Sequence, residues 1–223
     1  MSEPDASTSS APSGFTRVKR LPERGRYDRE TIDPILDAGF VCHLGHVVEG
    51  QPVVTPTMYW RHGDQVYFHG SAASRMLKTL GGAAIRCCLT VTHADGLVLA
   101  RSGFHHSMNY RSVMLFGSAI MVEDPEEKRA ALEAFVERLV PGRWPGLRPV
   151  TARELKATTV MRLAIEEASA KVRSGPPKDD DEDYGLPIWA GVIPLTVTAG
   201  APEPDPRLHD PSLTPPALRL DPS

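Results

Sequence analysis

This 223-residue chain has little cysteine, no excess of basic charge and no long apolar run. Its 25 Lys and Arg against 28 Asp and Glu give a formal net charge of −3, which argues against nucleic acid as a main partner, because a phosphate backbone needs a basic excess. No run of about eighteen apolar residues is present, so the sequence predicts no transmembrane helix and no membrane partner.

The three cysteines are an odd number, and two of them, Cys87 and Cys88, are adjacent. This arrangement favours neither a disulfide framework nor a C-x-x-C metal site. We expect Cys42, Cys87 and Cys88 to pack as small apolar groups in a reducing compartment. Because the N-terminus also lacks the apolar segment of a signal peptide, a cytoplasmic protein is expected.

The length fits one domain between two tails. Residues 1–14 are rich in Ser, Ala and Pro, and residues 196–223 are rich in proline and poor in large apolar side chains. We expect both tails to be disordered, because neither has enough apolar surface to bury. The folded domain is then expected to span residues 15–195.

Short apolar runs separated by turn residues dominate the folded part. They predict a helix over 28–38, strands over 40–47, 53–60 and 65–69, two strands over 84–92 and 97–101 joined by a hairpin turn at 93–96, and a long strand over 110–122. Gly117 is a candidate bulge in that long strand. Capping patterns at Asp124 and Thr151 predict two more helices before a strand over 161–172.

These patterns add up to six or seven antiparallel strands with two to four peripheral helices, a mainly β fold. A small barrel is the expected architecture, because closing the sheet removes its exposed edges.

A candidate anion site follows the strand that ends at His69. Gly70 and Ser71 begin a small-residue turn, Ser74 can cap a helix, and Arg75 with Lys78 lies in the first turn of that helix. Cations at a helix N-terminus oppose the helix dipole, so a bound negative group is expected there, and a phosphate suits the free amides and the guanidinium. The alternative is that both cations are a solvated helix face.

Four segments in order carry a family resemblance: 55–59 (Thr-Pro-Thr-Met-Tyr), 67–78, 109–117 (beginning Asn-Tyr-Arg-Ser-Val) and the pair 171–173 and 189–191. In this order the chain resembles the pyridoxamine 5′-phosphate oxidase-like flavoproteins, especially the branch of nitroimidazole-resistance proteins. The resemblance implies a split β-barrel that binds FMN between the two subunits of a homodimer.

The resemblance also implies roles for individual residues. His69 would lie at the active site, and Ser74, Arg75 and Lys78 would hold the FMN phosphate. The residues expected to contact the cofactor are Thr57, Met58, Tyr59, His69, Gly70, Ser71, Ser74, Arg75, Lys78, Tyr110, Arg111, Ser112 and Trp189. No arginine follows Trp189 within residues 190–194, which argues against pyridoxamine phosphate as the substrate.

For two of these residues, a purely structural role is an alternative to a functional one. His69 fits either a donor or proton source beside the flavin or a satisfied histidine at a strand end. Arg111 fits either a cation beside the flavin or a charge on the outside of a barrel strand. The acidic run 178–183 is expected to be a solvated loop.

Histidine pairs occur at His43 with His46 and at His105 with His106. On strands the members of each pair point to opposite faces, so a metal site is not expected. A haem ligand is a stronger alternative, since split-barrel relatives bind or degrade haem, and His69, His105 and His106 are the candidates.

The resemblance implies an FMN-dependent oxidoreductase that takes electrons from NAD(P)H or a reduced partner and passes them to a small nitro-aromatic or quinone-like substrate. No Rossmann fingerprint is present, so a nicotinamide would dock transiently on the flavin. The alternatives are a haem-binding or haem-degrading protein on the same fold, and a flavin-binding stress protein without turnover.

Overall fold

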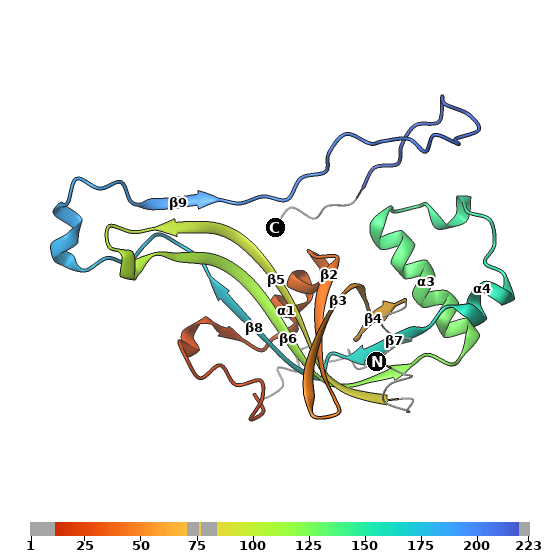
Figure 1. Ribbon diagram of the computed structural model, residues 1–223, viewed down its shortest axis with the longest axis horizontal. Helices are drawn as coiled ribbons and strands as arrows, with labels where there is room; N and C mark the ends of the chain where they lie inside the picture. Colours follow the sequence, from red (N-terminus) through yellow and green to blue (C-terminus); the bar gives the residue numbers. More distant parts are fainter. Residues whose placement is uncertain (1–11, 71–75, 77–83, 219–223) are drawn as a thin grey trace, which may run out of the picture.

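The structure, a computed structural model, describes residues 12–70, 76 and 84–218 (Figure 1). Its strands are β1 (Gly25–Arg26), β2 (Val41–Val48), β3 (Gln51–His62), β4 (Gln65–His69), β5 (Ala84–Leu99), β6 (Ser107–Met121), β7 (Val160–Ala164), β8 (Glu167–Arg173) and β9 (Gly191–Pro194). Its α-helices are α1 (Arg29–Asp37), α3 (Pro125–Leu139) and α4 (Ala152–Ala157), and its 3₁₀ turns are η1 (Pro22–Arg24), η2 (Gly103–His105), η3 (Trp144–Gly146) and η4 (Asp181–Gly185). The mainly β prediction is confirmed, with more strands than expected.

Six strands close into a barrel. The antiparallel pairings run β6–β7–β4–β3–β2–β5, and β5 pairs again with β6, so the ring has no free edge. The side chains of β5 alternate, with Ile85, Leu89 and Val91 buried inside the barrel against Val113 and Leu115 of β6.

The strands β5 and β6 continue past the barrel as a long curved hairpin, here called the arm (Figure 1). On the arm, β9 pairs with the β5 edge and β8 with the β6 edge, and β1 pairs with β8. The arm is therefore a five-stranded extension of the barrel sheet, with η2 at its tip.

The predicted hairpin turn at 93–96 is wrong, because residues 84–99 form one strand. The register shifts at a bulge between Ala94 and Gly96, whereas Gly117, the candidate bulge, pairs regularly with Cys87. A Cβ at Gly96 would lie 2.9 Å from Val192 Cγ1, so this glycine permits the close approach of β9 instead of a turn.

The predicted strand over 161–172 is also divided. β7 ends at Ala164 and β8 begins at Glu167, and between them the Ile165 N–H donates to the Asp64 carbonyl at 2.9 Å. β7 completes the barrel, while β8 leaves it to pair with β6 along the arm.

The cysteine prediction is confirmed for two of the three residues. Cys42 and Cys87 are free thiols buried in the barrel core, and Cys88 is half-buried. Burial raises the pKa of Cys42 to about 12 and that of Cys87 to about 11, so both thiols stay protonated near neutral pH.

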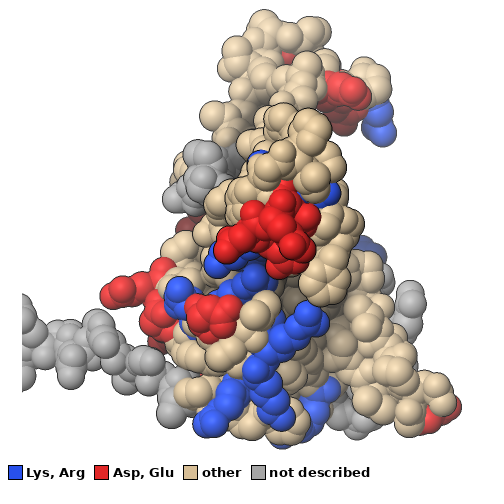
Figure 2. Space-filling model, turned by 90° about the vertical axis from the view of Figure 1, so that its left-hand side faces the viewer, with Lys and Arg blue, Asp and Glu red and all other residues tan. Residues whose placement is uncertain are grey.

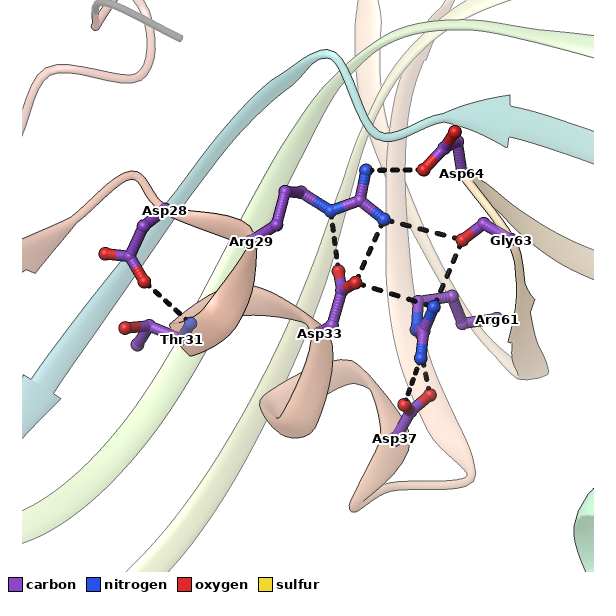
Figure 3. Close-up of polar contacts among 8 residues, drawn as sticks. All are labelled: Asp28, Arg29, Thr31, Asp33, Asp37, Arg61, Gly63 and Asp64. Atoms are coloured by element: carbon purple, nitrogen blue, oxygen red, sulfur yellow. Dashed lines mark hydrogen bonds and ion pairs between the residues drawn. The ribbon is translucent and has the colours of Figure 1, made fainter. Parts of the chain in front are cut away.

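Helix α1 lies against the barrel with Ile32, Ile35 and Leu36 buried in the core. Asp28 caps the helix by accepting from the Thr31 N–H at 2.7 Å, as its position in the sequence predicts. Figure 3 shows how charge fixes the opposite side of the helix.

In this network Arg29 binds Asp33 at 2.7 Å and Asp64 of the β3–β4 turn at 2.9 Å. Arg61 of β3 contacts Asp33 at 3.5 Å and makes two hydrogen bonds to Asp37 (Figure 3). Two arginines and three aspartates thus connect α1 to the β3–β4 hairpin in a partly buried, mutually satisfied network.

Helix α3 covers the outside of β3, β4 and β7. It begins at the predicted cap Asp124, and it packs Ala131 and Phe135 against Trp60, Tyr67 and Val160. The predicted capping box of Thr151 and Glu154 is present at the start of α4.

Residues 195–218 contain no helix or strand, and their side chains are exposed. No helix in the described part of the chain combines the length and the apolar character needed to cross a membrane.

Candidate functional site

A surface with several exposed apolar side chains lies on the outside of the barrel sheet. We call it the outer face, and it is formed by outward side chains of β3, β2, β5 and β6. The register aligns Pro56, His43, Thr90 and Met114 in one row across these strands. Val41, Val54, Met58 and Met114 are all exposed apolar side chains on this surface.

Two of the predicted cofactor residues lie on the outer face, and a third lies beside it. Met58 pairs with Val41 on β3–β2 and is 39% exposed. Ser112 pairs with Thr92 on β6–β5, and its hydroxyl donates to the Lys171 carbonyl at 3.3 Å. Tyr110 has the same strand parity as Ser112 and is half-buried at the base of the arm.

Thr57, Tyr59 and Arg111 have the opposite strand parity. The Tyr59 hydroxyl donates to the Leu36 carbonyl at 2.6 Å, and its backbone N–H donates to the Phe40 carbonyl at 3.1 Å. Burial raises the pKa of Tyr59. The Tyr59 side chain is therefore part of the core, and Thr57 is half-buried on the same side of β3.

The side chain of Arg111 is bound by a residue that sequence reasoning missed. Its Nε and a terminal nitrogen each donate to one oxygen of Asp95 at 2.9 Å, and both side chains are about one-quarter exposed (22% and 30%). Asp95 sits at the β5 bulge, where the irregular backbone turns its carboxylate toward β6. This bidentate pair neutralises the cation that the resemblance places beside a flavin.

His69 lies at the end of β4, against helix α3. Its ring makes edge contacts with Trp60 at 5.4 Å and Phe135 at 5.1 Å between ring centroids. The register that pairs Tyr59 with Phe68 brings His69 next to Met58, at the border of the outer face. His69 Nδ1 is buried and has no hydrogen-bond partner among the described residues.

Burial lowers the pKa of His69 from 6.5, so its imidazole is neutral near pH 7. Gly70 follows with φ +113°, a conformation that glycine adopts without strain, and its N–H donates to the Thr159 carbonyl at 3.3 Å. The chain therefore leaves β4 through a turn that requires glycine.

Ser71, Ser74, Arg75 and Lys78 lie outside the described residues, so their predicted phosphate contacts stay predictions. Met76, which is described, is helical and 4% exposed in the barrel core.

Trp189 lies apart from this group. It precedes β9 on the arm and is 65% exposed, and its ring lies against Gly191. A Cβ at residue 191 would lie 3.1 Å from the ring, so the glycine leaves room for the indole.

A second surface feature, here called the arm cavity, lies between the tip of the arm, the end of β8 and residues 20–24. It has a volume of about 660 Å³. Its lining includes His105, His106 and four cations: Arg20, Arg24, Arg173 and Lys178. Figure 2, which faces this end of the molecule, shows a band of Lys and Arg below a cluster of Asp and Glu.

The acidic run 178–183 is partly ordered around the tip of the arm. The side chain of Asp179 is fully buried, and it accepts from the Arg101 backbone N–H and from the Arg101 guanidinium, both at 2.9 Å. Tyr184 stacks on the same guanidinium, 4.9 Å from ring centroid to Cζ. The prediction of a fully solvated loop is therefore wrong at Asp179.

A family model described as pyridoxamine 5′-phosphate oxidase matches residues 28–172. The chain belongs to the pyridoxamine 5′-phosphate oxidase family. The predicted family is thus confirmed, and with it the split-barrel fold. No curated protein matches this chain.

Two similar solved structures cover most of the chain. The flavocytochrome Anf3 from Azotobacter vinelandii is 50% identical over 94% of this chain and 99% of its own, with a TM-score of 0.86. The FAD and haem binding protein from Mycobacterium smegmatis is 38% identical over 86% of this chain and 94% of its own, with a TM-score of 0.80.

A structure described as a 5-nitroimidazole antibiotic resistance protein from Bacteroides thetaiotaomicron is 21% identical over 66% of this chain and 86% of its own, with a TM-score of 0.52. This likeness shows the shared fold.

The arm cavity includes residues that lie outside the region matched by the family model. The match ends at Val172, whereas the cavity also uses residues 20–24 and 173–178. The barrel and outer face thus belong to the common family fold, and much of the cavity lining comes from segments outside the matched region. Arg173 lies in one of the four segments of the resemblance, but the pattern gave no sign that Arg20 and Arg24 lie near it.

The burial of His69 predicts its titration. In an NMR titration of the imidazole signals, His69 should have a midpoint below 6.5, because burial disfavours the charged ring. Its contribution to the free energy of unfolding is then complete above pH 6.5, the pKa in the unfolded chain, and is lost as the pH falls through the lower folded-state pKa. A midpoint at or above 6.5 would contradict the buried environment.

Proposed function

We propose that this protein is a redox protein of the flavocytochrome type, with a flavin on the outer face and a haem in the same chain. The observation that carries the proposal is the likeness to two proteins described as a flavocytochrome and as an FAD and haem binding protein, at 50% and 38% identity over nearly the whole chain. Identity at this level supports a shared set of cofactors.

The outer face has the character that a flavin ring needs. Val41, Met58 and Met114 offer exposed apolar surface, while Thr90 and Ser112 add hydroxyls without charge. Planar cofactors bind mainly to apolar walls with a few placed polar groups. The neutral His69 at the border of this face is suited to donate a hydrogen bond to a bound ring or substrate, or to accept a proton from it.

We assign the flavin phosphate to the segment that follows β4, with Ser71, Ser74, Arg75 and Lys78 as its partners. The family resemblance implies FMN, whereas the relative from M. smegmatis is described as binding FAD. We propose FAD for this chain because that relative aligns with 86% of it. FMN and FAD both contain the phosphate to which these four residues are assigned.

We further propose a homodimer whose second copy covers the outer face and encloses the flavin. Exposed apolar side chains from β2, β3 and β6 lie together there, and an apolar patch of this kind is typical of an interface. Tyr110 then borders the site from the base of the arm.

Together the two cofactors supply two-electron chemistry at the flavin and one-electron chemistry at the haem. The chain supplies binding, exclusion of water and a hydrogen-bond donor at His69. The reductant is proposed to be NAD(P)H or a reduced partner, and the acceptor a small nitro-aromatic or quinone-like molecule. The pair of Arg111 and Asp95 holds the sheet at the base of the arm and adds no net charge to the site.

Removing the proposed phosphate partner tests the flavin assignment. Arg75→Ala should weaken flavin binding by about 1.5–3 kcal/mol, the usual loss for a charge-assisted hydrogen bond. Fluorescence titration of the flavin-free protein with FAD and with FMN measures this loss and also shows which flavin binds more tightly. Arg129→Ala is the matched control, because Arg129 is an exposed residue of α3 paired with Glu126.

Unchanged affinity in Arg75→Ala would disprove the phosphate assignment. Equal losses in both variants would show a general effect of surface charge.

A charge on the outer face tests the dimer. Val54 is 64% exposed, so Val54→Lys should leave the fold of one chain intact but disrupt an apolar interface. Light scattering after size exclusion should give twice the chain mass of 24.3 kDa for the unmodified protein and a shift toward one chain mass for the variant. Val197→Lys, at an 89% exposed position in the C-terminal segment, is the control and should stay dimeric. A monomeric unmodified protein would contradict the proposal.

A further inference from the structure

The arm cavity gathers positive charge, two histidines and an exposed aromatic ring in one place. Its volume of about 660 Å³ lies within the range of roughly 300–1,000 Å³ typical of ligand sites. The segment 20–24 forms part of the lining, and the Lys171 ammonium holds it against β8 by donating to the Arg20 carbonyl at 3.1 Å. The pairing of β1 with β8 fixes the same segment at its other end. A ligand would therefore meet a wall that the fold already holds in place.

The charge of the lining is unbalanced. Four cations and one carboxylate line the cavity, and Arg20, Arg173 and Lys178 make no ion pair within the described part of the chain. Glu23, the carboxylate, is 4.0 Å from Arg24, and its side chain is 64% exposed, so it offsets only part of that charge. The lining thus carries a net positive charge, which attracts an anion.

The environment of Arg173 shows the effect of this imbalance. Its guanidinium donates to neutral groups, the Asn109 side-chain oxygen and the Gly175 carbonyl. Burial and the charge of Arg24 lower the pKa of Arg173. An anion bound by both guanidiniums would relieve their repulsion, and the fork of donors on a guanidinium suits the oxygens of a phosphate.

His106 adds a hydrogen-bond acceptor to this positive lining. Its Nδ1 lies 2.8 Å from the Ser102 carbonyl, and since a carbonyl only accepts, Nδ1 carries the proton. In the neutral ring Nε2 is then an acceptor. His105, in contrast, has Nε2 3.3 Å from an oxygen of Asp180. A ligand that suits the cavity therefore combines anionic oxygens with a hydroxyl or amino group that can donate to His106.

Phe104 supplies a flat aromatic surface at the tip of the arm. It lines the cavity and is 89% exposed, and its ring lies edge-on to that of His105 with 5.1 Å between the ring centroids. Aromatic rings stack on the bases of nucleotides, while neighbouring cations bind the phosphates. Cations, an acceptor and an exposed aromatic ring together match the three parts of a nucleotide: phosphate, ribose and base.

We propose that the arm cavity is a nucleotide site, in which Arg24 and Arg173 bind the phosphates of a nucleoside diphosphate. The base then lies against Phe104, and a ribose hydroxyl donates to His106 Nε2. Two sources carry this group: a free nucleotide, and NAD(P)H, for which the inference rests on the proposed function. The site is separate from the flavin on the outer face.

Binding of ADP to the full chain tests this site. The protein is first loaded with FAD and freed of excess, so that ADP does not enter the flavin site, and the affinity for ADP is measured by calorimetry. Arg24→Ala combined with Arg173→Ala should weaken ADP binding at least tenfold, because the phosphates lose both guanidiniums. Arg153→Ala combined with Lys156→Ala removes the same charge from exposed positions of α4 and should bind ADP within about twofold of the unmodified protein.

A second variant separates the base from the phosphates. Phe104→Ala should weaken ADP binding by roughly fivefold, because stacking on the base is lost. Inorganic pyrophosphate has no base, so its affinity should stay the same in this variant. Equal losses for ADP and pyrophosphate would contradict the place assigned to the base.

The outcomes separate this site from the proposed function. A protein that binds no ADP, or an arginine variant that binds it as tightly as the unmodified chain, would overturn the nucleotide site and leave the flavin and haem proposals standing. Loss of FAD from the arginine variant would show that the cavity holds the adenosine half of the flavin, which also overturns a separate site. Where ADP binds as predicted, NADP⁺ decides the source: displacement of ADP assigns the site to the reductant, and no displacement assigns it to a free nucleotide.

Discussion

The pairing of β5 with β6 is the constraint on which the rest of the structure depends. One continuous ladder from Ala84 to Val98 of β5 closes the barrel at one end and builds the arm at the other. Because both ends share the same strands, the outer face and the arm cavity are fixed relative to each other by backbone hydrogen bonds. A barrel of paired strands gives the site a rigid base, which loops alone would not.

Ion pairs mainly attach other segments of the chain to the β5–β6 ladder and to the barrel. Arg111 and Asp95 span the bulge where barrel becomes arm, and Arg101 with Asp179 attaches the segment before β9 to the tip of the arm. Around α1, Arg61 and its aspartates fasten the helix to the β3–β4 hairpin (Figure 3). In each case the carboxylate accepts more than one hydrogen bond or ion pair, so the ions are satisfied without a ligand. In the described part of the chain, Arg20, Arg173 and Lys178 of the arm cavity have no ion pair, and this contrast makes the cavity a candidate site.

Local signals were readable in the sequence, and long-range ones were not. The caps Asp28, Asp124 and Thr151 act on amides two or three residues away, so the helices they begin could be predicted. The residues of His93–Gly96 suit a turn, which is why the sequence predicts one. Gly96 instead leaves room for the close approach of β9, which lies almost a hundred residues later in the chain. The order of the four family segments led to the right fold, because the fold of a family already includes the pairings between strands that are distant in the sequence.

The candidate sites divide in the same way. Met58, His69 and Ser112 were found through the resemblance, and the structure brings Met58 and Ser112 onto one outer face with His69 at its border. Asp95 was missed because its pairing with Arg111 depends on a bulge that the sequence pattern does not mark. The cluster of Arg24 and Arg173 is formed by β1 and β8 lying side by side, and no sequence spacing reports it.

The most direct test of the account is the absorbance spectrum of the purified protein, with the released cofactors identified by mass. The account predicts flavin bands together with a Soret band, and one flavin and one haem per chain. A protein that carries a flavin alone, or a haem alone, after both have been supplied would contradict the claim that one chain binds both cofactors.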